Sequence, residues 1–420
     1  MTNTIQTSCM DPFEKDSIRV DQAVDKILQT TPVIADYNQV SLRDCLNRVV
    51  YQDVLSPIQV PAHDNSAMDG YALRCDDLPQ EGVKVFNVVG TAFAGKPYLG
   101  HCGENQCVRI MTGAVIPEGT DTVVIQEQVI LQDENHIEVS AGHRKNQNLR
   151  FAGEDIAKNS PVLSRGDRIA AAELGVLASL GLGELKVFRK PRVSFFSTGD
   201  ELKSIGQPLA EGEIYDSNRY SLFGLLSQCH VDIIDMGVIR DDPASIRDAL
   251  LSAASCSDLI LTSGGVSVGE ADYIKGILRE VGNMDFWKIA MKPGRPLTFG
   301  KINGTLFMGL PGNPVAVMVT FYQFVLPCLS KLSGKGYTPP LRLNAITQSN
   351  IRKSPGRREF QRAIASNDES GQMTVSLTGK QGSGILSSMK KANCFLVLEE
   401  ERGPVQEGEM VRVEFFKDYF

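Results

Sequence analysis

The sequence lacks the charge balance and the composition of several specialised classes of protein. It carries 43 Lys and Arg against 50 Asp and Glu, a formal net charge of −7. General nucleic-acid binding needs a basic surface to meet the phosphates, so this balance argues against that class. A few lysines in a cleft can still bind a small anion. With 42% hydrophobic and 22% charged residues, the chain also lacks the composition of a disordered or fibrous protein.

The sequence also has no disulfide pattern and no long hydrophobic run. Its nine cysteines are odd in number and scattered, which is typical of reduced thiols. Residues 1–15 lack the charged and apolar regions of a secretory signal. The most apolar stretch, residues 315–328, is interrupted by Thr320 and Gln323, and we expect it to be too short to span a bilayer. We therefore expect a cytoplasmic protein without a membrane segment.

The hydrophobic patterns that are present divide the chain into several domains. Helical periodicity begins at Ser17, and residues 41–49 carry a capping signal and an apolar stripe that predict another helix. Short β-type runs then follow, before helical periodicity returns at residues 170–180. Further on, apolar runs alternate with helical stretches, which predicts βαβ units and a mainly parallel sheet. The predicted fold class is α/β plus β domains: a helical domain (17–56 with 149–190), an inserted β domain (57–148), an α/β domain (191–335) and a C-terminal β domain (336–420).

Polar or glycine-rich loops follow the predicted strands of the α/β domain, where parallel sheets bind ligands. Asp200 and Glu201 at one strand end could hold a hard cation or orient water. They could equally complement a helix N-terminus, and their spacing does not separate the two. The glycine-rich residues 263–273 could bend the backbone around a phosphate. They could also form a flexible turn, because the loop matches neither the P-loop nor the dinucleotide fingerprint.

Two further segments are rich in basic residues. Lys292 and Arg295 are each followed by a proline, and Lys288 is close to them in the sequence. A stiff cationic loop suits phosphate or another oxyanion, because little ordering entropy is lost on binding, whereas a solubilising turn has no need of stiffness. Near the C-terminus, the basic residues between Arg352 and Arg362 form either an anion-facing edge or a solvated β edge whose charges prevent aggregation.

Six segments, taken in order, resemble the signature of the molybdopterin molybdenumtransferases, the bacterial MoeA-type family to which the C-terminal domain of gephyrin is similar. The resemblance covers nearly the whole chain, and six ordered motifs are far more specific than any one of them. The segments are residues 64–72, 109–114, 197–202, 263–273, 292–296 and 309–315.

The resemblance implies the final step of molybdenum cofactor biosynthesis. Adenylyl-molybdopterin and molybdate would react in the presence of Mg²⁺, releasing AMP and placing molybdenum on the dithiolene. It also implies a four-domain homodimer whose active site is shared between protomers, and it suggests the upstream adenylyltransferase as a partner. Small molecules are the expected substrates, and we expect neither nucleic acid nor membrane as a partner.

The resemblance assigns roles to individual residues. The catalytic positions are Asp69, Thr112, Glu201, Asp241 and Asp272, and the last three of these are the implied magnesium ligands. The substrate-binding positions are Gly264, Gly265, Ser267, Lys288, Lys292, Arg295, Pro311, Pro314, Arg362 and Ser383. Two positions depart from the family. Ala316 stands where a serine is frequent, which removes a hydroxyl donor for molybdate, and Arg295 replaces a frequent lysine and changes the hydrogen-bond geometry.

Two other functions remain open at this point. The related adenylyltransferases share the α/β domain, so adenylyl transfer to molybdopterin is an alternative, although those enzymes lack the inserted and C-terminal β domains. A non-catalytic molybdopterin-binding scaffold is the other alternative. The presence of Glu201, Asp241 and Asp272 argues against a retired active site.

Overall fold

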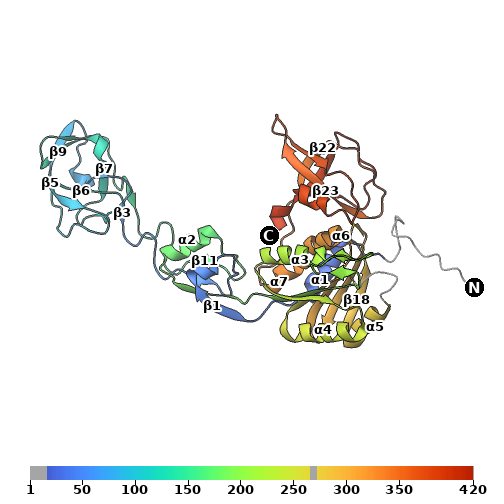
Figure 1. The fold of residues 1–420 in the computed structure, drawn as a ribbon. Coiled ribbons are helices and arrows are strands. Elements are labelled where there is room, and N and C mark those ends of the chain that lie inside the picture. Colours follow the sequence, from blue (N-terminus) through green and yellow to red (C-terminus); the bar gives the residue numbers. More distant parts are fainter. Residues whose placement is uncertain (1–16, 265–271, 420) are drawn as a thin grey trace, which may run out of the picture. The chain divides into compact units, whose positions relative to one another are not determined.

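The structure, a computed structural model, describes residues 17–264 and 272–419 (Figure 1). The chain separates into two compact units, and each is described by itself. The smaller unit comprises Gln39–Leu46 and Val50–Lys186. The larger unit comprises Met1–Asn38, Asn47–Val49 and Val187–Phe420.

The smaller unit contains a six-stranded sheet in the order β7-β4-β6-β5-β9-β8. Burial alternates along β9, where Ile137 and Val139 are buried between exposed ends. These side chains pack with Phe86 and Cys107 in one core cluster, and β4 is buried along its whole length. This sheet lies within the range expected for the inserted β domain. Its strands are β4 (Gly70–Leu73), β5 (Val83–Ala92), β6 (Gln106–Ile110), β7 (Thr122–Ile125), β8 (Val129–Leu131) and β9 (His136–Ser140).

The rest of the smaller unit is less helical than the sequence predicts. The helix expected in residues 41–49 is only a 3-10 turn, Leu42–Cys45. The Ser41 hydroxyl donates to the Asp44 carboxylate at 2.7 Å, so it does not cap a backbone N–H, and Asn47 has a left-handed φ of 63°. The other elements are β2 (Val54–Leu55), β3 (Asn65–Ser66), β10 (Leu149–Arg150), β11 (Pro161–Leu163), α2 (Ala171–Ser179) and two 3-10 turns (Cys75–Asp77 and Gln126–Gln128). Strands β1 (Tyr37–Ser41) and β12 (Glu184–Phe188) occur where the chain passes between the units.

The larger unit is built on a six-stranded sheet in the order β16-β13-β17-β21-β20-β18. Four neighbouring strands are parallel and in register at their carboxyl ends, so that Ser197 pairs with Ser263 and Ser263 with Leu310. Two antiparallel strands complete the sheet, which confirms the mainly parallel prediction. The parallel strands are β13 (Arg192–Thr198), β16 (Asp232–Ile239), β17 (Leu259–Ser263) and β21 (Thr305–Leu310), and the antiparallel ones are β18 (Gly282–Lys288) and β20 (Pro296–Ile302).

Helices cover both faces of this sheet because successive strand residues point to opposite faces (Figure 1). Phe195 packs in the cluster that holds the buried side chains of α1, α3, α6 and α7, whereas Phe196 packs in the cluster that holds those of α4 and α5. The helices are α1 (Val20–Thr30), α3 (Ser217–Gln228), α4 (Pro243–Cys256), α5 (Asp272–Val281), α6 (Pro314–Thr320) and α7 (Leu326–Leu332).

Helices α6 and α7 join through a π-helical segment, Phe321–Val325, into one helix, Pro314–Leu332. The expectation that this region is too short for a membrane is wrong on length, because the helix has 19 residues and a mean hydropathy of 1.6. However, 83% of its most apolar window is buried within the protein. Phe321 and Phe324 have no exposed surface and pack in the main core, so the segment has the burial of a core helix.

The C-terminal part of the larger unit is a second six-stranded sheet, as predicted, in the order β19-β23-β24-β22-β26-β25. An extra pairing of β23 with β25 closes it upon itself. Its first strand, β19 (Met291–Lys292), comes from the cationic loop of the α/β domain and pairs with the start of β23. The remaining elements are β14 (Leu202–Lys203), β15 (Ile214–Tyr215), β22 (Leu343–Thr347), β23 (Arg358–Asn367), β24 (Met373–Leu377), α8 (Ser387–Lys391), β25 (Cys394–Leu398), β26 (Met410–Phe415) and a 3-10 turn (Phe416–Tyr419).

Candidate active site

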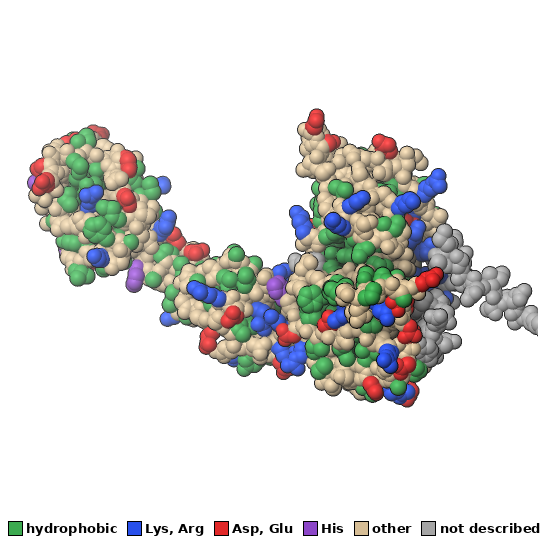
Figure 2. Space-filling model, viewed as in Figure 1, with side chains coloured by type: hydrophobic (Ala, Val, Ile, Leu, Met, Phe, Trp, Pro, Cys, Tyr) green, Lys and Arg blue, Asp and Glu red, His purple; other side chains and the backbone are tan. Residues whose placement is uncertain are grey.

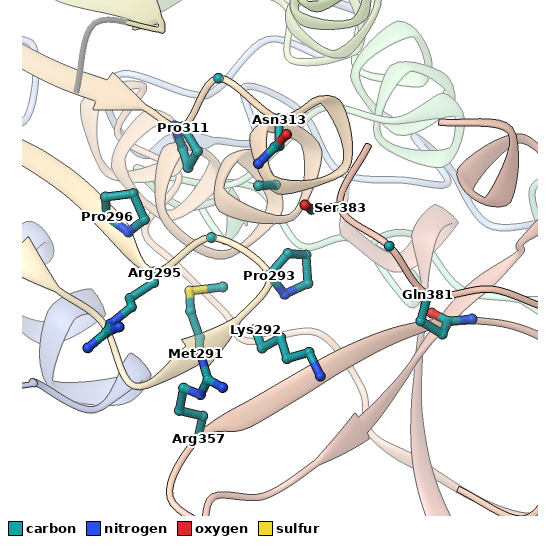
Figure 3. A pocket seen from close by; sticks show the side chains of 14 residues that line it. Met291, Lys292, Pro293, Arg295, Pro296, Pro311, Asn313, Arg357, Gln381 and Ser383 are labelled. Atoms are coloured by element: carbon teal, nitrogen blue, oxygen red, sulfur yellow. The ribbon is translucent and has the colours of Figure 1, made fainter. Parts of the chain in front are cut away.

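A pocket of about 310 Å³ lies where the α/β domain meets the C-terminal sheet (Figure 3). Its walls come from the loop after β19, the start of α6, the arm before β23 and the loop before α8. The predicted residues Lys292, Arg295, Pro311 and Ser383 all line it, together with Ala316. The other lining residues are Met291, Pro293, Gly294, Pro296, Gly312, Asn313, Arg357, Gln381 and Gly382.

The cationic loop in this pocket has little freedom to move. Gly294 has a φ of 100°, and a Cβ there would lie 2.7 Å from Thr320 Cγ2, so only glycine fits. The Ile289 N–H donates to the Arg295 carbonyl at 2.7 Å, and Lys292 pairs with Glu359 of β23 along the sheet. The predicted stiffness of the loop therefore has a structural basis in both domains.

Lys292 is half exposed, and its Nζ lies 3.5 Å from Glu359 Oε1, while Glu359 itself is buried. The Gln361 amide donates to the other Glu359 oxygen at 2.8 Å. Glu359 thus holds the lysine at the pocket without lining the pocket itself. Lys288, at the end of β18, and Pro314, at the first position of α6, do not line the pocket either.

Arg362 lies behind the wall of the pocket, not in its lining. Its side chain is only 1% exposed, and it donates to Ser388 Oγ at 3.0 Å and to the Gly382 carbonyl at 3.1 Å. Burial lowers the pKa of the guanidinium to about 10. The described residues include no carboxylate within ion-pair distance of Arg362, so its positive charge is uncompensated next to the segment that presents Ser383.

The carboxyl ends of β13 and β16 bring two predicted acidic residues to neighbouring loops. The Asp241 N–H donates to Asp200 Oδ1 at 3.5 Å, which joins the loop of Asp241 to that of Glu201. A Cβ on Gly199 would lie 2.7 Å from Glu201 Oε2, so this carboxylate rests against the backbone of its own loop. A group of three metal-binding side chains does not occur among the described residues. The magnesium set therefore stays a prediction.

Part of the glycine-rich loop can be placed at the same rim. Gly264 has a φ of 89°, and a Cβ there would lie 2.7 Å from the Thr198 carbonyl. Asn218, at the start of α3, donates to the Gly312 carbonyl at 2.7 Å. Gly265 and Ser267 lie outside the described residues, and Asp272 begins α5 but its side chain is outside them as well.

The smaller unit brings two of the motif segments together. Both the hydroxyl and the main-chain N–H of Thr112 donate to Asp69 Oδ1 at 2.7 Å. These hydrogen bonds, the one from the hydroxyl first, hold the pKa of Asp69 below its ordinary value of 3.8. Asp69 is thus a fixed, ionised carboxylate at neutral pH.

Several residues that line the pocket were not predicted from the sequence. Arg357 belongs to the basic strip, residues 352–362, which the sequence allowed to be either an anion-facing edge or a solvated β edge. Neither interpretation distinguished Arg357 from its neighbours. Gln381 carries no sequence signal of its own, and Asn313 lies in the motif segment 309–315 but received no role there. Gln381 binds the main chain of Arg362 in both directions, at 2.8 and 3.0 Å. Such a role depends on a contact across the pocket wall, which periodicity and motif spacing do not report.

Comparison with known proteins agrees with this architecture. Residues 18–181 match the MoeA N-terminal region (domain I and II), residues 194–331 the probable molybdopterin binding domain, and residues 344–416 the MoeA C-terminal region (domain IV). The chain is 46% identical over 400 residues to a molybdopterin molybdenumtransferase of Haemophilus influenzae, covering 95% of this chain and 98% of that protein. It is 34% identical to gephyrin of Dictyostelium discoideum, covering 94% of this chain and 61% of gephyrin.

Solved structures agree as well. The crystal structure of a molybdopterin biosynthesis moeA protein from Pyrococcus horikoshii superposes with a TM-score of 0.83 at 29% identity, and covers 95% of this chain and all of that one. The sequence match and the structural match both extend across the inserted sheet, the α/β domain and the C-terminal sheet. The chain belongs to the MoeA-type molybdopterin molybdenumtransferase family.

Proposed function

We propose that this chain inserts molybdenum from molybdate into adenylyl-molybdopterin and releases AMP, the final step of molybdenum cofactor biosynthesis. The observation that carries this proposal is the pocket between the α/β domain and the C-terminal sheet. The described residues that line it include three cations, Lys292, Arg295 and Arg357, and no carboxylate. Such a lining favours an oxyanion over a neutral or cationic ligand.

Lys292, Arg295 and Ser383 are the residues to which we assign contact with the oxyanion. Rigid donors stabilise an anion with little reorganisation, and the loop of Lys292 is fixed by Gly294 and by its pairing with β23. Arg362 would act from behind, by holding the Gly382 carbonyl and by adding positive potential. Asn313, whose amide lines the pocket one turn before Ala316, could supply the donor that a serine at position 316 would provide.

The adenylate half of the substrate would bind along the carboxyl rim of the parallel sheet. We assign Gly264, Gly265 and Ser267 to its phosphates, with Lys288, Pro311 and Pro314 shaping the neighbouring loops. Glu201, Asp241 and Asp272 follow parallel strands or begin the next helix, and their hard oxygen atoms suit Mg²⁺. When bound, this ion would withdraw charge from the phosphoanhydride whose cleavage releases AMP.

We further propose that the active enzyme is a homodimer in which Asp69 and Thr112 of one protomer complete the site of the other. Their rigid hydrogen-bonded pair supports a functional role, because it keeps a carboxylate charged on an exposed surface. The upstream adenylyltransferase is the partner that would supply the substrate. A division into four domains and a cytoplasmic location belong to the same proposal, and the eight described cysteines, none in a disulfide, suit such a location.

The experiment that tests this proposal measures AMP. Purified protein, adenylyl-molybdopterin and Mg²⁺ should release AMP only when molybdate is added. Lys292→Gln should lower that rate at least about tenfold, because it removes one charge-assisted contact. Lys390→Gln, an exposed lysine of α8 outside the pocket, is the matched control and should leave the rate unchanged. Release of AMP independent of molybdate, or adenylylation of molybdopterin with ATP, would contradict the proposal.

A further inference from the structure

The core helix Pro314–Leu332 meets the C-terminal sheet along a seam whose side chains do not line the pocket. The ring of Tyr322 stacks on that of Phe416, with 5.5 Å between the centroids, and lies 5.5 Å from the ring of Phe395 and 4.7 Å from that of Tyr419. These contacts join the π-helical segment of the helix to β25 and to the last turn of the chain. The seam consists of Tyr322, Gln323, Phe395, Glu414, Phe416 and Tyr419.

A buried carboxylate in the seam is linked to the helix by hydrogen bonds. Glu414, in β26, has no exposed surface. Its Oε2 accepts a hydrogen bond from the Tyr419 hydroxyl, and its Oε1 accepts one from Arg342 Nε at 2.7 Å. The Gln323 amide, on the helix, donates to the Tyr419 hydroxyl at 2.7 Å and lies 3.4 Å from Glu414 Oε2. Tyr419 therefore connects the carboxylate of the sheet to the helix.

The hydroxyl of Tyr419 stays protonated in these surroundings. Burial and the nearby Glu414 carboxylate raise its pKa well above 10. The phenol therefore remains a donor to Glu414 throughout the physiological pH range. Apolar packing alone has no preferred direction, whereas hydrogen bonds to a charged group fix a geometry. The network thus defines how the sheet sits on the helix.

The same helix and the same C-terminal domain provide facing walls of the pocket (Figure 3). Asn313 and Ala316 line it from the start of the helix, and Ser383 lines it from the segment before α8. The Val315 N–H crosses between these walls and donates to the Ser383 carbonyl at 3.0 Å. Gln323 lies about two turns of helix after Ala316, roughly 10 Å along the axis. The seam therefore supports both walls from close by.

From this arrangement we propose that Gln323, Glu414 and Tyr419 are positioning residues, which seat the C-terminal sheet on the core helix and so hold the two walls of the pocket in place. The effect on the substrate rests on the proposed function, whereas the seating of the sheet does not depend on it. If the seam loosens, fewer molecules have both walls in place, and the apparent affinity for the ligand falls by the same factor. The rate of the bound complex is then unchanged, because the residues that contact the ligand are unaltered.

Amide hydrogen exchange tests the seating directly, in full-length protein with isotope-labelled valine followed by NMR. Tyr419→Phe keeps the ring and removes the hydroxyl, and Gln323→Leu removes the amide while leaving the Tyr419 hydroxyl paired. Each variant should speed the exchange of the Val315 N–H at least about fivefold, because its acceptor lies across the pocket. The Val317 N–H, which donates at 3.0 Å within the start of the helix, should change by less than about twofold.

A double variant and a control complete the comparison. Tyr419→Phe combined with Gln323→Leu should exchange within about twofold of Tyr419→Phe alone, because the single variant already breaks the link that Gln323→Leu removes. Tyr220→Phe is the matched control. It removes a hydroxyl from α3, outside the seam, where the side chain is 48% exposed, and should leave both amides unchanged.

Steady-state AMP release by the same proteins separates a positioning role from a purely structural one. Tyr419→Phe and Gln323→Leu should each raise the KM for molybdate about 3- to 10-fold, with kcat within about twofold of the unmodified protein. Lower thermal stability with unchanged Val315 exchange and unchanged KM, or equal acceleration of Val315 and Val317, would overturn the proposal. Selective acceleration of Val315, combined with no AMP release by the unmodified protein, would support the positioning role and refute the proposed function.

Discussion

At the scale of single residues, main-chain groups help to position the charged side chains Asp69 and Arg362. The Asp69 carboxylate accepts hydrogen bonds from both the hydroxyl and the N–H of Thr112, and Arg362 donates a hydrogen bond to the Gly382 carbonyl in the pocket wall. Both contacts hold a charge in one place before any ligand arrives. A preorganised charge of this kind contributes to binding because it needs no reorganisation.

Thr112→Val should raise the pKa of Asp69 toward its ordinary value, because the hydroxyl donor is lost. The rise should be partial, since the main-chain N–H at position 112 still donates. Thr112→Ser keeps the hydroxyl and should leave the pKa low. NMR titration of the side-chain carboxyl carbon measures both variants, and equal pKa values in the two would contradict the assignment.

The same contact has a defined pH dependence. The pKa of Asp69 is lower in the folded protein than the ordinary value of 3.8, so folding favours the charged form. The contribution of this contact to stability is therefore present above about pH 4 and is lost as the pH falls through the folded-state pKa. Thr112→Val should reduce this acid dependence.

At the scale of secondary structure, a strand of only two residues connects two domains and shapes the pocket. β19 leaves the α/β domain, pairs with β23 of the C-terminal sheet and leads directly into the loop of Lys292 and Arg295. Gly294 allows that loop to turn back against Thr320. The position of both cations thus depends on one glycine and two residues of pairing.

Gly294→Ala should destabilise the protein by about 1–3 kcal/mol, because φ is positive there and the added carbon would contact Thr320. Gly224→Ala is the matched control. Gly224 lies inside α3 with open space around it, and alanine there should stabilise the protein by about 0.5–1 kcal/mol. Urea denaturation compares the two, and a loss of stability in Gly224→Ala equal to that in Gly294→Ala would show that the backbone conformation at 294 is unimportant.

At the scale of the larger unit, one buried arginine joins the first helix to the C-terminal sheet. Arg358 of β23 contacts Asp21 of α1 and the carboxylates of Glu399 and Glu400. On the face shown in Figure 2, basic and acidic side chains are otherwise interspersed. The arm that presents Arg357 therefore depends on a contact with a residue more than 300 positions earlier in the chain.

Arg358→Met should cost about 3–5 kcal/mol of stability, because it leaves the buried Glu400 carboxylate without its cation. Asp21→Asn should cost far less, since the Asp21 side chain is 69% exposed. The hydrogen bond from Arg358 lowers the pKa of Asp21, so the Asp21 contribution is present above pH 3.8 and is lost as the pH falls further. Equal losses in the two variants, measured by urea denaturation, would contradict this account.

A mixing experiment tests the shared active site at the scale of the whole molecule. Asp69→Asn and Lys292→Gln should each have strongly reduced activity as homodimers, because each places a substitution in both sites. Mixed dimers formed by refolding them together should regain activity, because one of their two sites then carries no substitution. Mixtures that contain mixed dimers, verified by differential tagging and mass spectrometry, but are no more active than the two homodimers would refute a site built from two protomers.

Much of the fold follows from local patterns in the sequence. Short β-type runs separated by turn residues predicted the strands of both β domains, and interleaved strand and helix patterns predicted the mainly parallel sheet. The helix predicted at residues 41–49 is wrong. A capping signal in the sequence shows only that a hydroxyl could cap the helix, and here the Ser41 hydroxyl donates to the Asp44 side chain instead. The basic loop of Lys292 was identified because proline and charge are visible in any sequence.

The sequence by itself determined most of the longer elements, their order and the family, because periodicity and motif order are properties of neighbouring residues. Only the tertiary structure decided that Arg358 and Arg362 are buried while Arg357 lines the pocket, although all three belong to one basic strip. It also decided that Gln381 and Asn313 share that pocket with Lys292. The physical reason is that burial and contact depend on which surfaces pack together, and those surfaces come from segments far apart in the chain.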